Sequence, residues 1–142
     1  MTLNILFLCT GNSCRSQMAE GWAKHLKADT FNAYSAGVET HGLNPMAVHV
    51  MAEAGVDISE QQSKTTDLLP EGVVFDYVVT VCNSAHEQCP FFPAKTKVIH
   101  VGFDDPPTLA KNAASEEEAL AHYRRVRDEI RSFVAGLPEN VM

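Results

Sequence analysis

Residues 3–9 read Leu-Asn-Ile-Leu-Phe-Leu-Cys, an almost unbroken apolar run. Such a run is typical of a central strand in a parallel sheet, because neighbouring layers cover both of its faces. From Ser16 onward, apolar residues recur at steps of three and four, which indicates an amphipathic helix. A buried strand that passes through a short loop into a helix predicts the start of a βαβ unit, and therefore an α/β fold.

The rest of the chain continues this alternation of strands and helices. Pro45 suits the first turn of a helix that ends at Gly55. Ser115 and Glu118 have the spacing of a capping box and predict a long C-terminal helix that ends near Gly136. Three further strands are predicted, over residues 32–36, 75–82 and 97–101.

The chain has 142 residues, which suits one hydrophobic core. No internal repeat, low-complexity tract or linker divides it. We therefore predict a single doubly wound α/β domain over residues 1–142, with a four-stranded parallel sheet flanked by helices.

Composition narrows the classes of partner. A net charge of −7 and a pI of about 5.2 argue against a nucleic-acid-binding surface. The apolar runs are too short to span a bilayer, and the polar residues after Cys9 do not resemble a signal peptide. The four cysteines are too few for a disulfide scaffold. We expect a cytoplasmic protein with no nucleic-acid or membrane partner.

The loop after the first strand has the features of an anion site. Successive N–H groups of a glycine-containing loop that enters a helix form a concave nest for an oxyanion. Arg15 can add two parallel hydrogen bonds, and the same positive environment favours the thiolate of Cys9, to which the Ser16 hydroxyl can donate. The side chain of Cys14 has no assigned chemistry and is expected to pack. The predicted oxyanion-binding residues are Thr10, Gly11, Asn12, Ser13, Cys14 and Arg15.

A second candidate element is the Asp-Asp-Pro segment after the fourth predicted strand. It should lie at the carboxyl edge of the sheet and face the first loop, where ligands bind in such folds. Asp105 precedes a proline, which keeps it out of the helical region and helps to fix its direction. A carboxylic acid there can protonate the oxygen that leaves when a thiolate attacks an oxyanion. An isolated Asp-Pro pair would instead be read as a surface turn.

Two further thiols are the third candidate element. Cys82 ends the third predicted strand, and its position can bring it close to Cys9. Cys82 and Cys89 would lie roughly 10 Å apart on a helix, too far for a disulfide, so such a helix would have to unwind for them to pair. This makes the segment a candidate redox switch. The alternatives are unrelated buried thiols, or a partial zinc site of Cys82, His86 and Cys89 without an evident fourth ligand, so we expect no metal.

These motifs resemble those of the thioredoxin-coupled arsenate reductases, a family built on the low-molecular-weight protein tyrosine phosphatase fold. The similarity runs nearly from end to end. It begins with Cys9-Thr-Gly-Asn-Ser-Cys-Arg-Ser-Gln-Met-Ala-Glu-Gly-Trp22. It continues through residues 34–45, 79–82, 89–90 and 102–106.

The resemblance implies a role for each matching residue. Cys9 would be the nucleophile, Arg15 the oxyanion clamp and Asp105 the general acid, while Cys82 and Cys89 would be successive resolving thiols. Arsenate would be the substrate in arsenic detoxification and thioredoxin the reductant, with no cofactor required.

One departure concerns potassium. In some members, an Asp that follows shortly after the segment matching Asp57-Ile58-Ser59 belongs to a monovalent-cation site near the first loop. Lys64 aligns with that Asp, and its ammonium group would replace the ion. The sequence therefore predicts that potassium is not required.

Two other functions share these residues. A protein tyrosine phosphatase would use the same nucleophile, clamp and acid, but it usually carries aromatic residues after the Asp-Pro, where this chain has Pro107 and Thr108. A thiol-based redox or metalloid sensor would need an oxidation-sensitive surface but no turnover.

Overall fold

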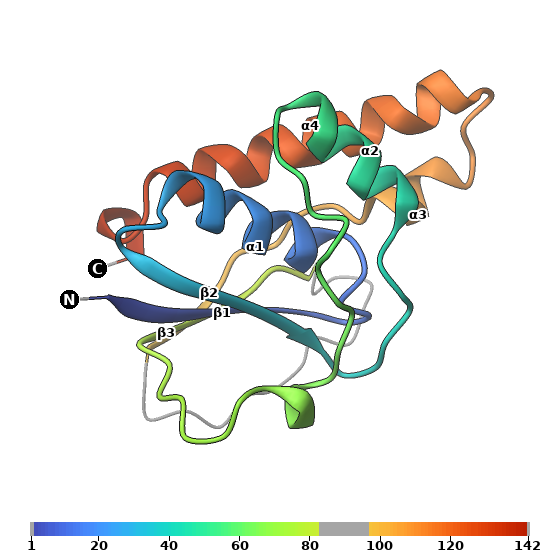
Figure 1. Ribbon diagram of the computed structural model, residues 1–142. Coiled ribbons are helices and arrows are strands. Elements are labelled where there is room, and N and C mark those ends of the chain that lie inside the picture. Colours follow the sequence, from blue (N-terminus) through green and yellow to red (C-terminus); the bar gives the residue numbers. More distant parts are fainter. Residues whose placement is uncertain (1, 83–96, 142) are drawn as a thin grey trace.

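The computed structural model describes residues 2–82 and 97–141. Four parallel strands form one sheet in the order β2-β1-β3-β4, with helices packed against it (Figure 1). The strands are β1 (Leu3–Cys9), β2 (Phe31–Gly37), β3 (Tyr77–Thr80) and β4 (Lys97–His100). The helices are α1 (Arg15–Leu26), α2 (Pro45–Glu53), α3 (Pro106–Ala110) and α4 (Glu116–Ala135), with 3-10 turns η1 (Thr66–Leu68) and η2 (Glu139–Val141). The predicted α/β fold with a four-stranded parallel sheet is confirmed.

Strand β1 lies at the centre of the sheet, as its apolar sequence predicts. It pairs with β2 on one side and β3 on the other, so that Leu6 lies between Tyr34 and Val78. The strand is fully buried from Ile5 to Leu8. Its last residue, Cys9, is opposite Gly37 and therefore reaches the carboxyl edge of the sheet, where β1 passes into the loop before α1.

Helices α1 and α4 pack together on one face of the sheet (Figure 1). The first nine residues of α1 are all buried, because the sheet and α4 enclose that part of the helix. The indole Nε1 of Trp22 donates to the carbonyl of Arg127 on α4 at 3.2 Å, and the Arg131 guanidinium lies 5.5 Å from the indole centroid. This packing fixes the helix whose first turn holds Arg15 and Ser16.

The opposite face of the sheet carries a smaller apolar cluster. Leu6, Leu8 and Val78 are fully buried there, and Leu69 and Phe75 from the chain between α2 and β3 pack against them. This apolar cover on both faces explains the nearly continuous hydrophobic sequence of β1.

The third strand is shorter than the predicted span of residues 75–82. Asp76 N donates to Asn4 O at 2.8 Å, and Val81 N donates to Leu8 O at 2.9 Å, so single hydrogen bonds extend the pairing beyond the regular strand. The carboxylate of Asp76 also accepts from Asn4 N at 2.8 Å, so this backbone N–H near the start of β1 has a side-chain partner. The predicted span of residues 75–82 therefore marks the paired segment but not the limits of regular β3.

The capping box at α4 uses the predicted residues Ser115 and Glu118, but the glutamate carboxylate binds the N–H of Ala114 and not that of Ser115. Ser115 Oγ accepts from Glu118 N at 3.1 Å, while the Glu118 carboxylate accepts from Ala114 N at 3.0 Å. The apolar residues Leu120, Tyr123, Val126, Ile130 and Val134 form a buried stripe on this helix, and Phe133 beside them is half-buried. Among the described residues, no helix has both the length and the apolar character needed to cross a membrane.

Candidate active site

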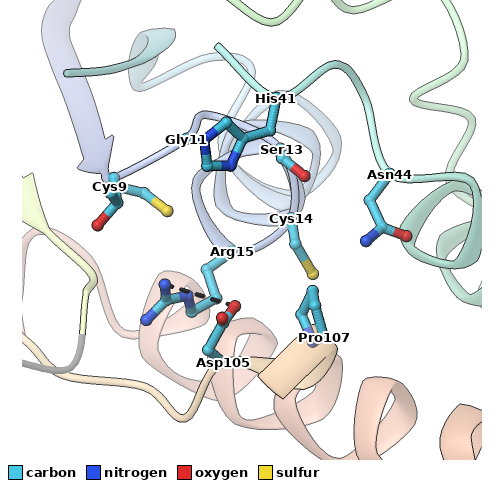
Figure 2. Close-up of a pocket in the computed structure, with 10 residues that line it drawn as sticks. Cys9, Gly11, Ser13, Cys14, Arg15, His41, Asn44, Asp105 and Pro107 are labelled. Atoms are coloured by element: carbon cyan, nitrogen blue, oxygen red, sulfur yellow. Dashed lines mark ion pairs between the residues drawn. The ribbon is translucent and has the colours of Figure 1, made fainter. Parts of the chain in front are cut away.

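A cavity of about 310 Å³ opens at the carboxyl edge of the sheet, where the β1–α1 loop meets the segment before α3 (Figure 2). Both motifs that the sequence singled out for oxyanion chemistry contribute to its wall. The lining residues are Cys9, Thr10, Gly11, Ser13, Cys14, Arg15, His41, Asn44, Asp105 and Pro107.

Asn12 holds the loop from behind the cavity. Its backbone has φ of 46°, a left-handed conformation that asparagine tolerates better than most residues, and its side chain is fully buried. Its Nδ2 donates to Ser16 Oγ at 2.9 Å and to Ser35 Oγ at 3.0 Å, and its Oδ1 accepts from Lys64 N at 2.8 Å. One amide thus joins the loop to α1, β2 and the segment after α2.

The carbonyl groups of the loop are occupied by the segment that follows β2. Thr10 O accepts from Val38 N at 3.0 Å and Glu39 N at 3.2 Å, and Gly11 O accepts from His41 N at 3.0 Å. Because the C=O and the following N–H of a trans peptide point in opposite directions, these bonds turn the next N–H groups toward the other side. That arrangement suits an anion in the cavity.

Gly37 makes this close packing possible at the end of β2. A Cβ at this position would lie 2.7 Å from Thr10 O and 2.8 Å from Asn12 N, both backbone atoms of the loop. A side chain would therefore have to displace the loop itself.

Arg15 and Asp105 lie side by side at the cavity wall and form an ion pair (Figure 2). The Arg15 side chain is buried; its Nη1 donates to Phe103 O at 3.1 Å, and its Nη2 lies 3.5 Å from Asp105 Oδ1. Thr108 Oγ1 donates to the other carboxylate oxygen of Asp105 at 2.7 Å. Asp104 instead forms an ion pair with Arg125 at 3.0 Å. Of the two neighbouring carboxylates, Asp105 is therefore the one that lines the cavity.

The thiols of Cys9 and Cys14 are both free and buried. Burial raises the pKa of the Cys14 thiol well above its usual value; the charges of Asp105 and Cys9 act in the same direction, and Arg15 acts against them. Cys14 is thus held in its neutral form, which suits the packing role expected for its side chain.

Cys82 lies just beyond the carboxyl end of β3 and is fully buried. The register pairs Leu8 with Thr80, so the chain leaves β3 for Cys82 next to the place where β1 ends in Cys9. Cys82 is disulfide-bonded in this structure. Cys89 and His86 lie outside the described residues, and within the described residues no group of His, Cys, Asp and Glu side chains has the arrangement of a metal site.

Ser16 is fully buried at the start of α1. Its hydroxyl oxygen accepts from Asn12, which leaves the hydroxyl hydrogen for another acceptor. The contact with a Cys9 thiolate stays a prediction.

A buried carboxylate extends the network behind the loop. Glu20 Oε1 accepts from Ser35 Oγ at 2.6 Å, and its Oε2 pairs with Lys24 Nζ at 2.6 Å. Lys64, which the sequence suggested as a substitute for potassium, donates its Nζ to Gln62 O at 3.1 Å. Lys24, one turn along α1, supplies the ammonium group next to the Glu20 carboxylate, and the replacement of potassium by Lys64 stays a prediction.

His41, Asn44 and Pro107 are cavity residues to which the sequence analysis gave no role. Asn44 Oδ1 caps α2 by accepting from Met46 N at 2.8 Å, while its Nδ2 donates to the hydroxyl of Tyr123 on α4 at 3.1 Å. His41 and Asn44 lie in the stretch 34–45 that carried part of the family resemblance, which was the one available signal.

Residues 4–142 match the sequence profile of the low molecular weight phosphotyrosine protein phosphatase family. The chain belongs to this family. The match includes the β1–α1 loop, Asp104, Asp105 and all four cysteines.

Individual relatives refine this placement within the family. An arsenate reductase of Bacillus licheniformis is 56% identical over 137 residues, which cover 95% of this chain and 94% of the relative. A solved arsenate reductase in the phosphate-binding state superposes with a TM-score of 0.77 at 29% identity and covers 99% of each chain. A low molecular weight protein tyrosine phosphatase of T. tengcongensis gives a TM-score of 0.70 at 27% identity, covering 97% of this chain and 99% of its own.

Proposed function

We propose that this protein is an arsenate reductase that uses a relay of three thiols, Cys9, Cys82 and Cys89, and is regenerated by thioredoxin. The observation that carries the proposal is the convergence of the free Cys9 thiol, Arg15 and Asp105 on one cavity at the edge of the sheet. A further thiol position, Cys82, follows the end of the neighbouring strand. The 56% identity to an arsenate reductase over nearly the whole chain supports the same function.

The first step is attack on a bound oxyanion. The loop N–H groups and the Arg15 guanidinium hold the arsenate oxygens, which places the arsenic next to Cys9 Sγ. The Cys9 thiolate forms an S–As bond while one oxygen leaves as water, with a proton from Asp105. Arsenic is still pentavalent at this point.

The next step transfers the electrons. Cys82, as a thiolate, attacks Cys9 Sγ; the S–As bond breaks and its electron pair stays on arsenic, which leaves as arsenite. The enzyme then holds a Cys9–Cys82 disulfide, so two thiols have been oxidised and one arsenate reduced. Attack by Cys89 on Cys82 frees Cys9 and produces a Cys82–Cys89 disulfide.

Thioredoxin is proposed as the reductant because the first disulfide would form at the buried Cys9. The Cys9 residue is only 4% exposed, so a partner thiol has poor access to it. Transfer of the disulfide to Cys82 and Cys89 would make it available to a dithiol protein through ordinary thiol–disulfide exchange.

Phosphate-ester hydrolysis is a second candidate, because the nucleophile, clamp and acid would serve it equally well. The family match and the similar phosphatase structure favour at least a side activity of this kind. However, among the described residues the cavity wall contains no Phe, Tyr or Trp to hold a phosphotyrosine ring, and Pro107 lies there instead. This composition favours a small oxyanion over an aryl phosphate ester.

A coupled assay tests the proposal. NADPH oxidation is followed with arsenate, thioredoxin and thioredoxin reductase, and in parallel with arsenate, glutaredoxin, glutathione and glutathione reductase. We expect sustained turnover with the thioredoxin system and formation of one arsenite per NADPH. Sustained p-nitrophenyl phosphate hydrolysis without arsenite formation in either system would identify a phosphatase, and a single stoichiometric thiol oxidation without turnover would identify a sensor.

A further inference from the structure

Among the described residues that line the cavity, His41 has a basic side chain that the proposed mechanism does not use. Its imidazole lies over Gly11 at the top of the cavity in Figure 2. A Cβ at Gly11 would lie 2.4 Å from His41 Nδ1, so the ring rests directly on the backbone of the anion loop.

Two contacts hold the imidazole in this place. The backbone N of His41 donates to Gly11 O at 3.0 Å, which ties the residue to the loop. On the other side of the ring, Nε2 lies 3.2 Å from a carboxylate oxygen of Glu39. The side chain is 55% exposed, so the ring forms the rim of the cavity, whereas Arg15 forms its buried floor.

The charge of the site gives this rim residue a function. Tetrahedral oxyanions such as phosphate and arsenate carry up to two negative charges near neutral pH, and the protein itself has a net charge of −7. Arg15 and His41 are the only basic side chains among the described residues that line the cavity, and Arg15 already faces the Asp105 carboxylate. A second basic group would therefore contribute strongly to oxyanion binding.

The Glu39 contact orients the imidazole for such a role. When Glu39 accepts from Nε2, an oxyanion can accept from Nδ1 only if both ring nitrogens carry hydrogen. A bound oxyanion would then have the ring between it and the Glu39 carboxylate.

We propose that His41 is an oxyanion-binding residue that contacts the outer oxygens of the substrate at the cavity mouth and sets its affinity. The inference rests on the proposed function, since it assigns a further contact to the same tetrahedral substrate. His41 contributes to capture of the oxyanion, whereas Cys9, Arg15 and Asp105 carry the chemical step.

The test uses inorganic phosphate as the probe and the full-length reduced protein. Phosphate is titrated against alkylation of Cys9 by iodoacetamide, with the modified cysteine identified by peptide mass. The variants are His41→Ala, which removes the ring, and His41→Gln, which keeps a neutral donor. His49→Gln is the matched control, because His49 Nε2 lies 3.4 Å from Glu53 in a similar exposed pair on α2, outside the cavity.

We expect the phosphate concentration for half-protection to rise about tenfold in His41→Ala, less in His41→Gln, and not at all in His49→Gln. In the thioredoxin-coupled assay, KM for arsenate should rise by a similar factor in His41→Ala while kcat changes by less than about threefold. Equal protection of wild type and His41→Ala would overturn the role of His41 and leave the proposed function standing. No protection of wild-type Cys9 at any phosphate concentration would instead remove the oxyanion site, and with it both proposals.

Discussion

The β1–α1 loop and the segment that carries the two aspartates meet at the same cavity, yet they are held in different ways. In the loop, Asn12 is buried, and its side-chain amide is hydrogen-bonded to Ser16 at the start of α1, to Ser35 in β2 and to Lys64 in the segment after α2. In the acid segment, Asp104 and Thr108 are exposed, and the described contacts of Asp105 are one ion pair and one hydroxyl.

This difference separates two tasks. A buried network leaves unsatisfied polar groups when one member is lost, which costs about 1–3 kcal/mol for each group. An exposed pair such as Asp104 and Arg125 contributes about 0–1 kcal/mol. On the proposed function, the loop would be a preorganised oxyanion site whose integrity is coupled to folding, while exposed residues of the acid segment could be altered at little cost to stability and would act mainly on the rate.

The largest effects should come from the reactive residues of the loop. Cys9→Ser should abolish arsenate reduction and any phosphatase activity, because a hydroxyl at neutral pH is a far weaker nucleophile than a thiolate. Arg15→Lys should be nearly as severe, since an ammonium group does not reproduce the planar pair of donors. Steady-state assays with arsenate and with p-nitrophenyl phosphate check both, and near-normal turnover in either variant would refute the assignment of the nucleophile and clamp.

Substitution of the cavity aspartate comes next. Asp105→Asn should lower kcat by about 10²–10⁴-fold, the usual contribution of a positioned acid, with little change in phosphate binding. Asp104→Asn is the matched control, because its carboxylate pairs with Arg125 and does not line the cavity. If the control loses activity and Asp105→Asn retains it, the acid has been assigned to the wrong aspartate.

Loss of the amide behind the loop should affect stability. Asn12→Ala removes hydrogen bonds to Ser16, Ser35 and Lys64 and places alanine at φ of 46°. We expect the free energy of unfolding in urea to fall by about 2–3 kcal/mol. Asn32→Ala, at an exposed position on β2, should change it by less than about 0.5 kcal/mol. A similar small change at Asn12 would mean that the loop is not coupled to folding.

The smallest effect should come from the hydroxyl that contacts the acid. Thr108→Val keeps the shape of the side chain but removes the donor to Asp105 Oδ2, so kcat should fall by about three- to tenfold while urea stability stays within about 0.5 kcal/mol. Thr108→Ser restores the donor and should recover most of the loss. A stability loss as large as that of Asn12→Ala would contradict the division between the two regions.

The elements that one continuous stretch encodes could be predicted from the sequence. The unbroken apolar run of β1, the loop from Cys9 to Ser16 and the helix after it lie in consecutive residues, so their order alone places an anion site at a strand end. The proline after Asp105 and the resemblance to arsenate reductases both favoured this member of the Asp-Asp pair, and its carboxylate lines the cavity.

Contacts between distant segments could not be read in this way. Ser35 meets Glu20 behind the loop because α1 packs beside β2, and the sequence does not indicate this contact, although Glu20 and Lys24 have the i,i+4 spacing of a helical ion pair. His41 reaches the cavity because backbone bonds tie its segment to the loop carbonyls. The short helix α3 was not predicted; prolines occupy its first positions, where no N–H is needed.

The central claim is that arsenic is reduced by Cys9 and Cys82, and that Cys89 then moves the disulfide away from the cavity. It is tested most directly by one turnover of fully reduced Cys89→Ser with a single equivalent of arsenate and no external reductant. The reaction is quenched by alkylation, disulfides are mapped by peptide mass, and arsenite is quantified. We predict about one arsenite per chain and a Cys9–Cys82 disulfide in this variant, against a Cys82–Cys89 disulfide in the wild type. Alkylation of both Cys9 and Cys82 with no arsenite, in a variant that still hydrolyses p-nitrophenyl phosphate, would contradict the relay and leave a phosphatase.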